Sequence, residues 1–489
     1  MEKDSTFRMV AKTMKGLEAV LADELRKMGA DNVAPGHRMV SFEGNLEMLY
    51  RANLCLRTAL RILKPFYTFT ATDTDSLYER VKEFDWGTLM NVDSTFSVDV
   101  VMNSDKFNHS RFATYRVKDA IADWFRDRYD RRPGVRLSDA DILINVHIQG
   151  TTVTLSLDSS GESLHKRGWR VASTEAPINE VLAAGILLMS GYDGSQPLVD
   201  PMCGSGTFLV EAALIAANIN PGVFRRNYAF QRWDNYDEEL FESLWDNEAG
   251  ERTPANLIMG ADMLPAAVEV TRRNLKAAGV SRYVDVEVRK LSEWTEAPAP
   301  SGIMVMNPPY GERISAPDME ELYSLIGQQL KKLFAGWEAW IISLKDEYFA
   351  NIGLAPSVKV SLMNGSLDCE LREFVMFAGS KREFRAKGGR IKTVQKEREP
   401  KKGSKDKSKR EWGTRAKASF PRGKGQFDKK EKSAPKFAEP TPAETVSSEN
   451  PLAARRNPKA LKSITNRTPS LPKTEGPIMR SRGWKKKSE

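Results

Sequence analysis

Short strand-like runs and amphipathic helical stripes alternate through the first 160 residues. A stripe of Leu17, Val20, Leu21, Leu25 and Met28 has helical spacing and ends near residue 29. We therefore predict a small α+β piece over residues 1–65 and a second α+β module over residues 66–160. The other predicted helices are 46–62, 76–83 and 112–128, and the predicted strands are 8–13, 39–42, 95–101 and a hairpin of 142–148 with 151–157.

From residue 165 to 380, apolar strands alternate with helices. This pattern predicts a mostly parallel, doubly wound α/β sheet of the Rossmann-like kind. Its last two strands, 358–363 and 371–377, are separated by a short turn and must be antiparallel, so we expect an edge hairpin. The earlier strands are predicted at 197–199, 257–261, 284–288, 303–306 and 339–344, and the helices at 208–217, 266–278 and 322–334.

Residues 381–489 have almost no periodic apolar pattern. They hold 33 Lys and Arg residues against 12 Asp and Glu residues, a net charge of +21, whereas residues 1–380 carry a net charge of −12. Ten of the 25 prolines also lie in this segment. Such a composition cannot bury enough apolar surface to fold, so we predict a disordered basic tail that binds RNA without reading its sequence.

Several classes of protein are unfavoured by the sequence. The longest apolar run, residues 181–189, is far shorter than the ~20 residues of a membrane span. The charged N-terminus is not followed by the apolar stretch of a secretory signal, so we expect none. Three scattered cysteines argue against both a disulfide framework and a structural zinc site, so we expect no metal. No P-loop motif occurs. We expect a soluble cytoplasmic protein.

The sharpest motif is Asp-Pro-Met-Cys-Gly-Ser-Gly-Thr at residues 200–207, directly after a predicted strand and before an apolar helix. Glycines let the chain turn tightly and let a ligand approach the backbone. Doubly wound sheets bind ligands outside the carboxyl ends of their strands. We therefore expect a cofactor to bind at Asp200, Cys203, Gly204, Ser205, Gly206 and Thr207, with Cys203 packing beneath it.

The residues around this loop favour S-adenosylmethionine. A nicotinamide fingerprint needs a third glycine where Leu209 stands, and the helix begins without a basic residue for phosphates. Asp200 would repel a pyrophosphate, but it suits the sulfonium and ammonium groups of S-adenosylmethionine. Asp262, at the end of the next strand, can accept hydrogen bonds from two ribose hydroxyls. The alternative is a glycine-rich turn without a cofactor.

A second motif, Asn307-Pro308-Pro309-Tyr310, follows the strand predicted at 303–306. It suits methylation of an exocyclic nucleobase amine, whose delocalised lone pair makes it a poor nucleophile. The Asn307 side-chain oxygen and the Pro308 carbonyl can each accept one N–H, the prolines stiffen the backbone, and Tyr310 can stack on the base. Positioning would supply most of the rate, and the base must be unpaired or flipped out. The alternative is a loop that only ends the strand.

These two motifs resemble the N-P-P-Y type of class I S-adenosylmethionine-dependent methyltransferase. Together with Leu-His-Lys-Arg-Gly-Trp-Arg at residues 164–170 and Ala-Pro-Ile-Asn-Glu at 176–180, they resemble the THUMP-domain RNA guanine-N2 methyltransferases, close to the bacterial 23S rRNA (guanine(2445)-N2)-methyltransferase family. The resemblance spans residues 6–380. It implies a ferredoxin-like piece, a THUMP RNA-binding domain and a catalytic domain, in that order.

The resemblance also implies roles for single residues. Asp200, Gly204, Gly206 and Asp262 would bind the cofactor, and Asn307, Pro308 and Tyr310 would hold the guanine. Residues 289–292, Arg-Lys-Leu-Ser, lack the Asp that holds the adenine amine in many members, so the adenine contact stays unassigned. The best-known fused members carry a second methyltransferase domain where this chain has its basic tail, so no second activity is implied.

RNA contacts are predicted where basic residues meet the catalytic domain. Lys166, Arg167 and Arg170 lie at the joint between the modules, and Arg313 follows the N-P-P-Y motif. The alternative at the joint is a solvated linker face. A weaker candidate is the basic stretch of the THUMP-like module, made of Lys106, His109, Arg111, Arg116 and Lys118.

The leading hypothesis is a guanine-N2 methyltransferase that acts on 23S rRNA or a large-subunit precursor. The rivals are a THUMP-type tRNA guanine-N2 methyltransferase, a DNA adenine-N6 methyltransferase with the same N-P-P-Y chemistry, and a non-catalytic RNA-binding ribosome assembly factor on an old enzyme fold. The THUMP-like module counts against the DNA enzyme, and the intact motifs count against the assembly factor.

Overall fold

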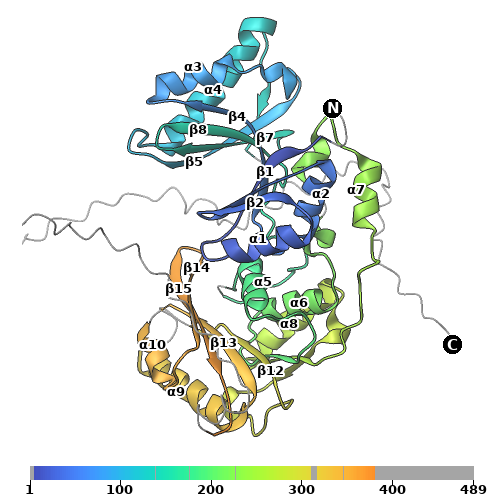
Figure 1. Cartoon of the computed structure of the whole chain (residues 1–489), viewed down its shortest axis with the longest axis vertical. Helices are drawn as coiled ribbons and strands as arrows, with labels where there is room; N and C mark the ends of the chain where they lie inside the picture. Colours follow the sequence, from blue (N-terminus) through green and yellow to red (C-terminus); the bar gives the residue numbers. More distant parts are fainter. Residues whose placement is uncertain are drawn as a thin grey trace, which may run out of the picture. The chain divides into compact units, whose positions relative to one another are not determined.

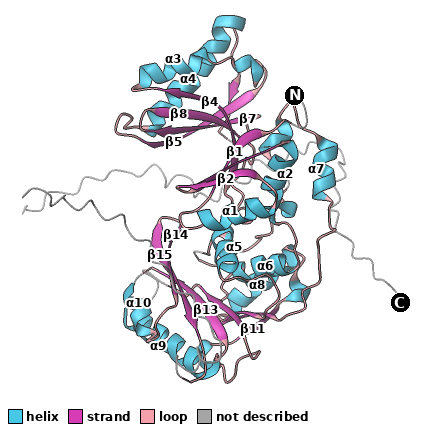
Figure 2. Cartoon of the chain, viewed as in Figure 1, coloured by secondary structure: helices cyan, strands magenta, loops and turns pink. Residues whose placement is uncertain are grey.

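The computed structural model describes residues 5–137, 139–175, 177–225, 227–309, 316–344 and 346–379. These residues form two β-sheets with helices packed on them (Figure 1; Figure 2). The predicted tail, together with Tyr310 and Arg313, lies outside the described residues.

The first sheet joins the two N-terminal modules. Its strands are β1 (Phe7–Lys12), β2 (Asp31–Gly36), β3 (Met39–Gly44), β4 (Arg61–Thr70), β5 (Thr95–Asn103), β6 (Gly134–Val135), β7 (Ile142–Gln149) and β8 (Thr152–Asp158), and their order is β2-β3-β1-β4-β8-β7-β5-β6. Strand β4 pairs with β1 at its start and with β8 from Leu63 onward. The boundary predicted at residue 65 therefore falls inside a strand that both modules share.

Four helices pack on this sheet, α1 (Glu18–Lys27), α2 (Leu46–Cys55), α3 (Thr74–Glu83) and α4 (Ser110–Tyr129). Figure 1 shows α3 and α4 together on one face of the half made by β4, β8, β7 and β5. Leu77 of α3 and Val117 and Ile121 of α4 are fully buried in one core with Trp86. The amphipathic stripe predicted for residues 112–128 is therefore the buried side of α4.

The helix predicted over residues 46–62 is wrong in its second half. Helix α2 ends at Cys55, and Ile62 belongs to strand β4. The backbone N–H groups of Arg57 and Thr58 donate to the carboxylate of Glu24 at 2.8 and 3.0 Å instead of continuing a helical ladder. A tertiary acceptor from α1 thus ends the helix, and no glycine or proline marks the position in the sequence.

The second sheet is the predicted doubly wound one. Its strands are β9 (Leu198–Asp200), β10 (Ile258–Asp262), β11 (Asp285–Val288), β12 (Gly302–Met306), β13 (Trp337–Ser343), β14 (Val358–Asn364) and β15 (Leu367–Val375), and their order is β11-β10-β9-β12-β13-β15-β14. The pairs from β11 to β13 are all parallel, and β15 is antiparallel to both β13 and β14. The predicted edge hairpin is present, with β15 inserted between its partner and β13.

Among the described residues of this part of the chain the helices are α5 (Glu180–Met189), α6 (Thr207–Ala216), α7 (Glu238–Trp245), α8 (Pro265–Ala277), α9 (Ala316–Leu333) and α10 (Asp346–Asn351). Leu182, Leu209 and Leu275, from α5, α6 and α8, share one core on one face of the sheet. Ile326 of α9 and Phe349 of α10 share a separate core on the other face. The sheet is therefore covered on both sides, as a parallel sheet requires.

Residues 5–65 are joined to the doubly wound α/β part of the chain by buried contacts. The guanidinium of Arg57 donates to the carbonyls of Leu214 and Ile219, at the end of α6, at 3.3 and 2.7 Å. Tyr50 on α2 stacks on Phe230 at 4.6 Å and meets Phe241 of α7 edge-on at 5.6 Å. Buried hydrogen bonds and aromatic contacts thus both connect these two parts of the chain.

No helix in the described ranges has the length and hydropathy to cross a membrane. Within the same ranges, no group of three or more His, Cys, Asp or Glu side chains is placed to hold a metal ion.

Candidate active site

The predicted cofactor loop connects β9 to α6. Its two glycines, Gly204 and Gly206, have φ values of +55° and +76°, a left-handed conformation that other residues rarely adopt. A Cβ on Gly206 would also lie 2.6 Å from Cγ2 of Thr271. The loop therefore needs glycine at position 206 for two independent reasons, conformation and space.

Two side chains of helix α8 form hydrogen bonds to this loop. The Thr271 hydroxyl donates to the Gly204 carbonyl at 2.9 Å, and the Asn274 amide donates to the Ser205 carbonyl at 2.9 Å. Both side chains are fully buried. The sequence prediction missed them, although two polar residues three apart on the inward face of a helix were the available signal.

Two carboxyl groups frame the loop. Asp200 is 1% exposed, and burial, with Asp262 nearby, raises the pKa of its carboxyl to about 8. Asp262 is partly exposed and accepts the N–H groups of Gly204 and Leu264 at 3.0 and 2.9 Å. Each carboxylate oxygen has a second lone pair, so Asp262 still has acceptor capacity for hydroxyl groups.

Cys203 is buried beneath the loop. Its backbone N–H donates to the Ala261 carbonyl at 2.9 Å, and its Sγ lies 3.7 Å from Oγ1 of Thr271. Burial raises the pKa of this thiol well above its usual range. The side chain is therefore a neutral packing group, as the sequence interpretation has it.

Arg170 lies against the cofactor loop. Its guanidinium donates to Oγ of Ser205 at 3.0 Å and to Oγ1 of Thr207 at 2.9 Å, and its Nε pairs with Glu180 at 2.7 Å. The sequence prediction gave Arg170 an RNA contact because only the linear neighbourhood was visible. In the fold, Arg170, 35 positions before Ser205, places a positive charge at the start of α6, where the loop itself has none.

Arg167 is not available to RNA, so this prediction is corrected. The side chain is 2% exposed, pairs with Glu211 at 3.3 Å, and donates to the carbonyls of Leu164 and Arg57. A buried charge needs such partners, and Arg167 joins the linker to α6 and the ferredoxin-like piece. Lys166 is exposed, with 60% of its side chain accessible, and pairs with Glu162 on the surface.

The N-P-P-Y motif begins where β12 ends. Strand β12 runs parallel to β9, which runs parallel to β10, so Asp200, Asp262 and Asn307 all lie at the carboxyl ends of adjacent strands. Oδ1 of Asn307 is buried and has no hydrogen-bond partner in the described part of the chain. Pro308 is buried and Pro309 is partly buried. An orphaned acceptor of this kind suits a substrate N–H.

The polar groups at this edge of the sheet fit S-adenosylmethionine. The cofactor brings hydroxyl and ammonium donors, and the edge offers the Asp262 carboxylate, the Asp200 carboxyl and loop carbonyls. Next to Asp262, Met263 and Leu264 are 58% and 57% exposed, and this apolar surface suits the adenine ring that the sequence left unassigned. The sequence prediction missed both residues because their exposure depends on the fold.

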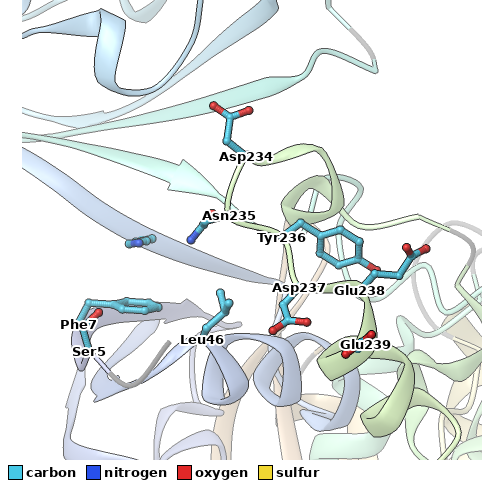
Figure 3. A pocket seen from close by; sticks show the side chains of 10 residues that line it. Ser5, Phe7, Leu46, Asp234, Asn235, Tyr236, Asp237, Glu238 and Glu239 are labelled. Atoms are coloured by element: carbon cyan, nitrogen blue, oxygen red, sulfur yellow. The ribbon is translucent and has the colours of Figure 1, made fainter. Parts of the chain in front are cut away.

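A cavity of about 490 Å³ lies elsewhere, between the ferredoxin-like piece and the segment before α7 (Figure 3). Phe7, Leu46 and Lys64 line one side, and residues 234–239, four of which are acidic, line the other. It contains none of the predicted site residues, so it is separate from the candidate active site.

Three family models match this chain. The RMKL-like methyltransferase domain matches residues 167–373, the RlmL ferredoxin-like domain matches residues 8–63, and the THUMP domain matches residues 71–158.

Two relatives carry names that bear on the reaction. The protein of Syntrophotalea carbinolica named "Ribosomal RNA large subunit methyltransferase K/L" is 40% identical over 384 residues, which cover 76% of this chain and 54% of that one. The Synechocystis sp. protein named "Putative RNA methyltransferase slr0064" is 38% identical over 370 residues, which cover 75% of this chain and 96% of that one. The chain thus spans about half the length of the K/L relatives it matches.

Solved structures agree in fold. The solved structure named "Crystal structure of SMU.472, a putative methyltransferase complexed with SAH" has a TM-score of 0.69 and 31% identity, and the match covers 78% of this chain and all of that one. TrmN from Thermus thermophilus, at 16% identity and a TM-score of 0.56, shares the fold.

A seven-stranded sheet with one antiparallel strand, a glycine-rich loop after β9 and an acidic residue at the end of the neighbouring strand β10 define the class I methyltransferase fold, the kind that uses S-adenosylmethionine. Within that class, the chain belongs to the RMKL-like methyltransferase family, with the family's RlmL-type ferredoxin-like and THUMP domains ahead of the catalytic one.

Proposed function

We propose that this protein transfers a methyl group from S-adenosylmethionine to the exocyclic N2 of a guanine in 23S rRNA, at a 2445-type site, or in a large-subunit precursor. The single observation that carries the proposal is the buried, unpartnered Oδ1 of Asn307 at the carboxyl edge of the sheet. The names of the K/L relatives support rRNA as the substrate.

The cofactor supplies an electrophilic methyl group on its sulfonium. On the side of this chain, Asp262 would accept the ribose hydroxyls, the exposed Met263 and Leu264 would hold the adenine ring, and Asp200 would bind the positive end. Gly204, Ser205, Gly206 and Thr207 shape the loop, Cys203 packs beneath it, and Arg170 holds the hydroxyls of Ser205 and Thr207.

Asn307 Oδ1 and the Pro308 carbonyl each accept one N–H of the guanine amine, which aims the nitrogen lone pair at the methyl carbon. The nitrogen held in this way would accept the methyl group that S-adenosylmethionine supplies when bound, and the methylated amine would release one proton to water. Pro309 stiffens the backbone, and Tyr310 stacks on the base. A base inside a helix cannot reach this site, so the guanine must be unpaired or flipped out.

RNA contacts at the mouth of the site come from Lys166 and Arg313 in this proposal. Lys166 is exposed, and its exposed partner Glu162 holds it only weakly. Arg313 follows the N-P-P-Y motif in sequence. The basic tail, with its net charge of +21, adds affinity for RNA of any sequence. We also propose that the protein works in the cytoplasm, where its rRNA substrate is made.

The proposal is tested by methyl transfer from labelled S-adenosylmethionine onto three substrates, namely protein-free 23S rRNA, large-subunit precursor particles and bulk tRNA. We expect label in 23S rRNA or in the particles. Label in tRNA alone would replace the rRNA proposal by the tRNA enzyme. If no RNA is labelled although the protein binds S-adenosylmethionine, the assembly-factor hypothesis replaces both.

A further inference from the structure

Helix α4 of the THUMP domain exposes an aromatic pair to solvent. Phe112 and Tyr115 are 52% and 51% exposed, whereas Ala113 and Val117 on the other side of the helix are buried in the core. Residues three apart lie on the same face of a helix, so the two rings are neighbours. Large aromatic side chains bury 150–250 Å² when they pack, and leaving two half-exposed side by side forgoes that stabilisation.

Cations flank the two rings. Nζ of Lys118 lies 5.0 Å from the centre of the Tyr115 ring, and Lys118 also meets Asp119 at 3.7 Å. Arg111 precedes Phe112, is exposed, and forms no ion pair with any residue in the described ranges. Arg111, Phe112, Tyr115 and Lys118 together are called the α4 patch.

The basic residues that the sequence groups into one stretch therefore differ in their surroundings in the fold. Arg116 turns away from the patch, pairs with Asp75 at 2.7 Å and stacks on Tyr78 at 4.5 Å. Lys106 and His109, which precede the helix in the sequence, are exposed. The charges that remain available are thus those beside the exposed rings.

We propose that the α4 patch binds an unpaired stretch of the RNA substrate, with two bases stacked on Phe112 and Tyr115 and their phosphates contacted by Arg111 and Lys118. This inference rests on the proposed function only in taking RNA as the substrate. Aromatic rings give single-stranded bases a surface that paired bases cannot use, because those bases are already stacked. The rings lie among exposed polar residues rather than in a continuous apolar area, which favours RNA over a protein partner.

The test compares fluorescence anisotropy of a single-stranded oligoribonucleotide and of a duplex with the same sequence, each titrated with the full chain over a range of salt concentrations. Each stacked base adds to the affinity, so the double variant Phe112→Ala/Tyr115→Ala should bind the single strand at least about tenfold more weakly. The loss should be the same factor at every salt concentration, because stacking releases no counterions. Arg111→Gln should instead lower the slope of log affinity against log salt by about 0.7.

The basic tail contributes equally to the wild type and to each variant, so their ratio isolates the patch. Tyr129→Ala is the matched control, because Tyr129 lies at the far end of the same helix and is 54% exposed. Phe112→Trp/Tyr115→Trp should restore binding, which a loss of folding would not allow.

Unchanged single-strand affinity of the double alanine variant, or an equal loss for the duplex, would overturn the proposal. Both results are read from binding, not from methylation. A negative binding result therefore leaves the proposed guanine methylation untouched. Conversely, the binding test decides whether the bases stack on the patch even if the protein methylates no RNA.

Discussion

At the residue scale, the candidate site depends on two side chains whose settings the sequence does not reveal. The sequence shows that Asp200 is an acidic residue at the end of a strand. Its burial comes from the packed sheet, and this burial raises the pKa of the carboxyl to about 8. The sequence shows Arg170 as a basic residue in a linker, but its hydrogen-bond partners lie 10 to 37 positions further along the chain. Motifs locate the loop, and long-range contacts decide what each charge does.

The raised pKa of Asp200 predicts a pH effect on stability. The unfolded carboxyl is ionised between about pH 4 and 8, whereas the folded one is protonated, so the folded state binds more protons in this window. The free energy of unfolding of the cofactor-free protein should therefore fall as pH rises from 4 to 8, and Asp200→Asn should remove this contribution. Thermal unfolding at several pH values measures both slopes. A wild-type slope that survives in Asp200→Asn would show that this carboxyl is not the source.

The raised pKa of Asp200 also predicts a proton release when S-adenosylmethionine binds. A cationic cofactor favours the ionised carboxylate, so at pH 7 binding of S-adenosylmethionine should release protons in the wild type and fewer in Asp200→Asn. Calorimetry in two buffers of different ionisation enthalpy counts those protons. Equal proton release in both proteins would contradict the placement of Asp200 at the positive end of the cofactor.

Arg170→Lys should raise the KM for S-adenosylmethionine several-fold, with the KM for RNA and kcat near their wild-type values. Lysine keeps the charge, but its single nitrogen cannot replace the three guanidinium nitrogens that separately contact Glu180, Ser205 and Thr207. Steady-state kinetics with each substrate varied in turn separates the two constants. Lys166→Gln is the control, and it should change only the KM for RNA. The opposite result for Arg170→Lys would return this residue to the RNA-contact role.

At the element scale, hydrophobic periodicity predicts the doubly wound sheet because its strands and helices carry their own signals. The strand of Asp200 and the strand of Asn307 both end in recognisable motifs. Elements whose ends are set by distant partners were not predictable. Glu24 ends α2 by capturing the backbone of residues 57 and 58, and β2, an exposed edge strand containing Asn32 and Pro35, has loop-like composition.

Gly206 tests how tightly α6 and α8 hold the cofactor loop. Gly206→Ala should lower the free energy of unfolding by about 1–3 kcal/mol and weaken S-adenosylmethionine binding, since its Cβ would press on Thr271. Gly279→Ala separates the two causes, because Gly279 has φ of +69° but nothing within 4 Å of a Cβ. Its cost should be about 1–2 kcal/mol with cofactor binding intact. Equal effects of the two variants would mean that the contact with Thr271 is unimportant.

At the scale of the whole molecule, the RNA-binding and catalytic parts are joined by buried contacts. Strand β4 belongs to both N-terminal modules, and Arg57, Arg167 and Glu211 connect the ferredoxin-like piece, the linker and α6. The sequence predicted separate modules with a basic joint. Burial of Arg167 makes part of that joint a structural connection, and we propose the α4 patch as a further RNA contact on the THUMP surface.

The central claim is that Asn307 holds a guanine amine for methylation. Nucleoside mass spectrometry of 23S rRNA, treated with S-adenosylmethionine and either the wild type or Asn307→Ala, tests it most directly. We predict N2-methylguanosine with the wild type and at least about a hundredfold less with Asn307→Ala, which should bind S-adenosylmethionine normally, because Asn307 only positions the amine. A methylated nucleoside other than N2-methylguanosine, or equal methylation by Asn307→Ala, would contradict the account.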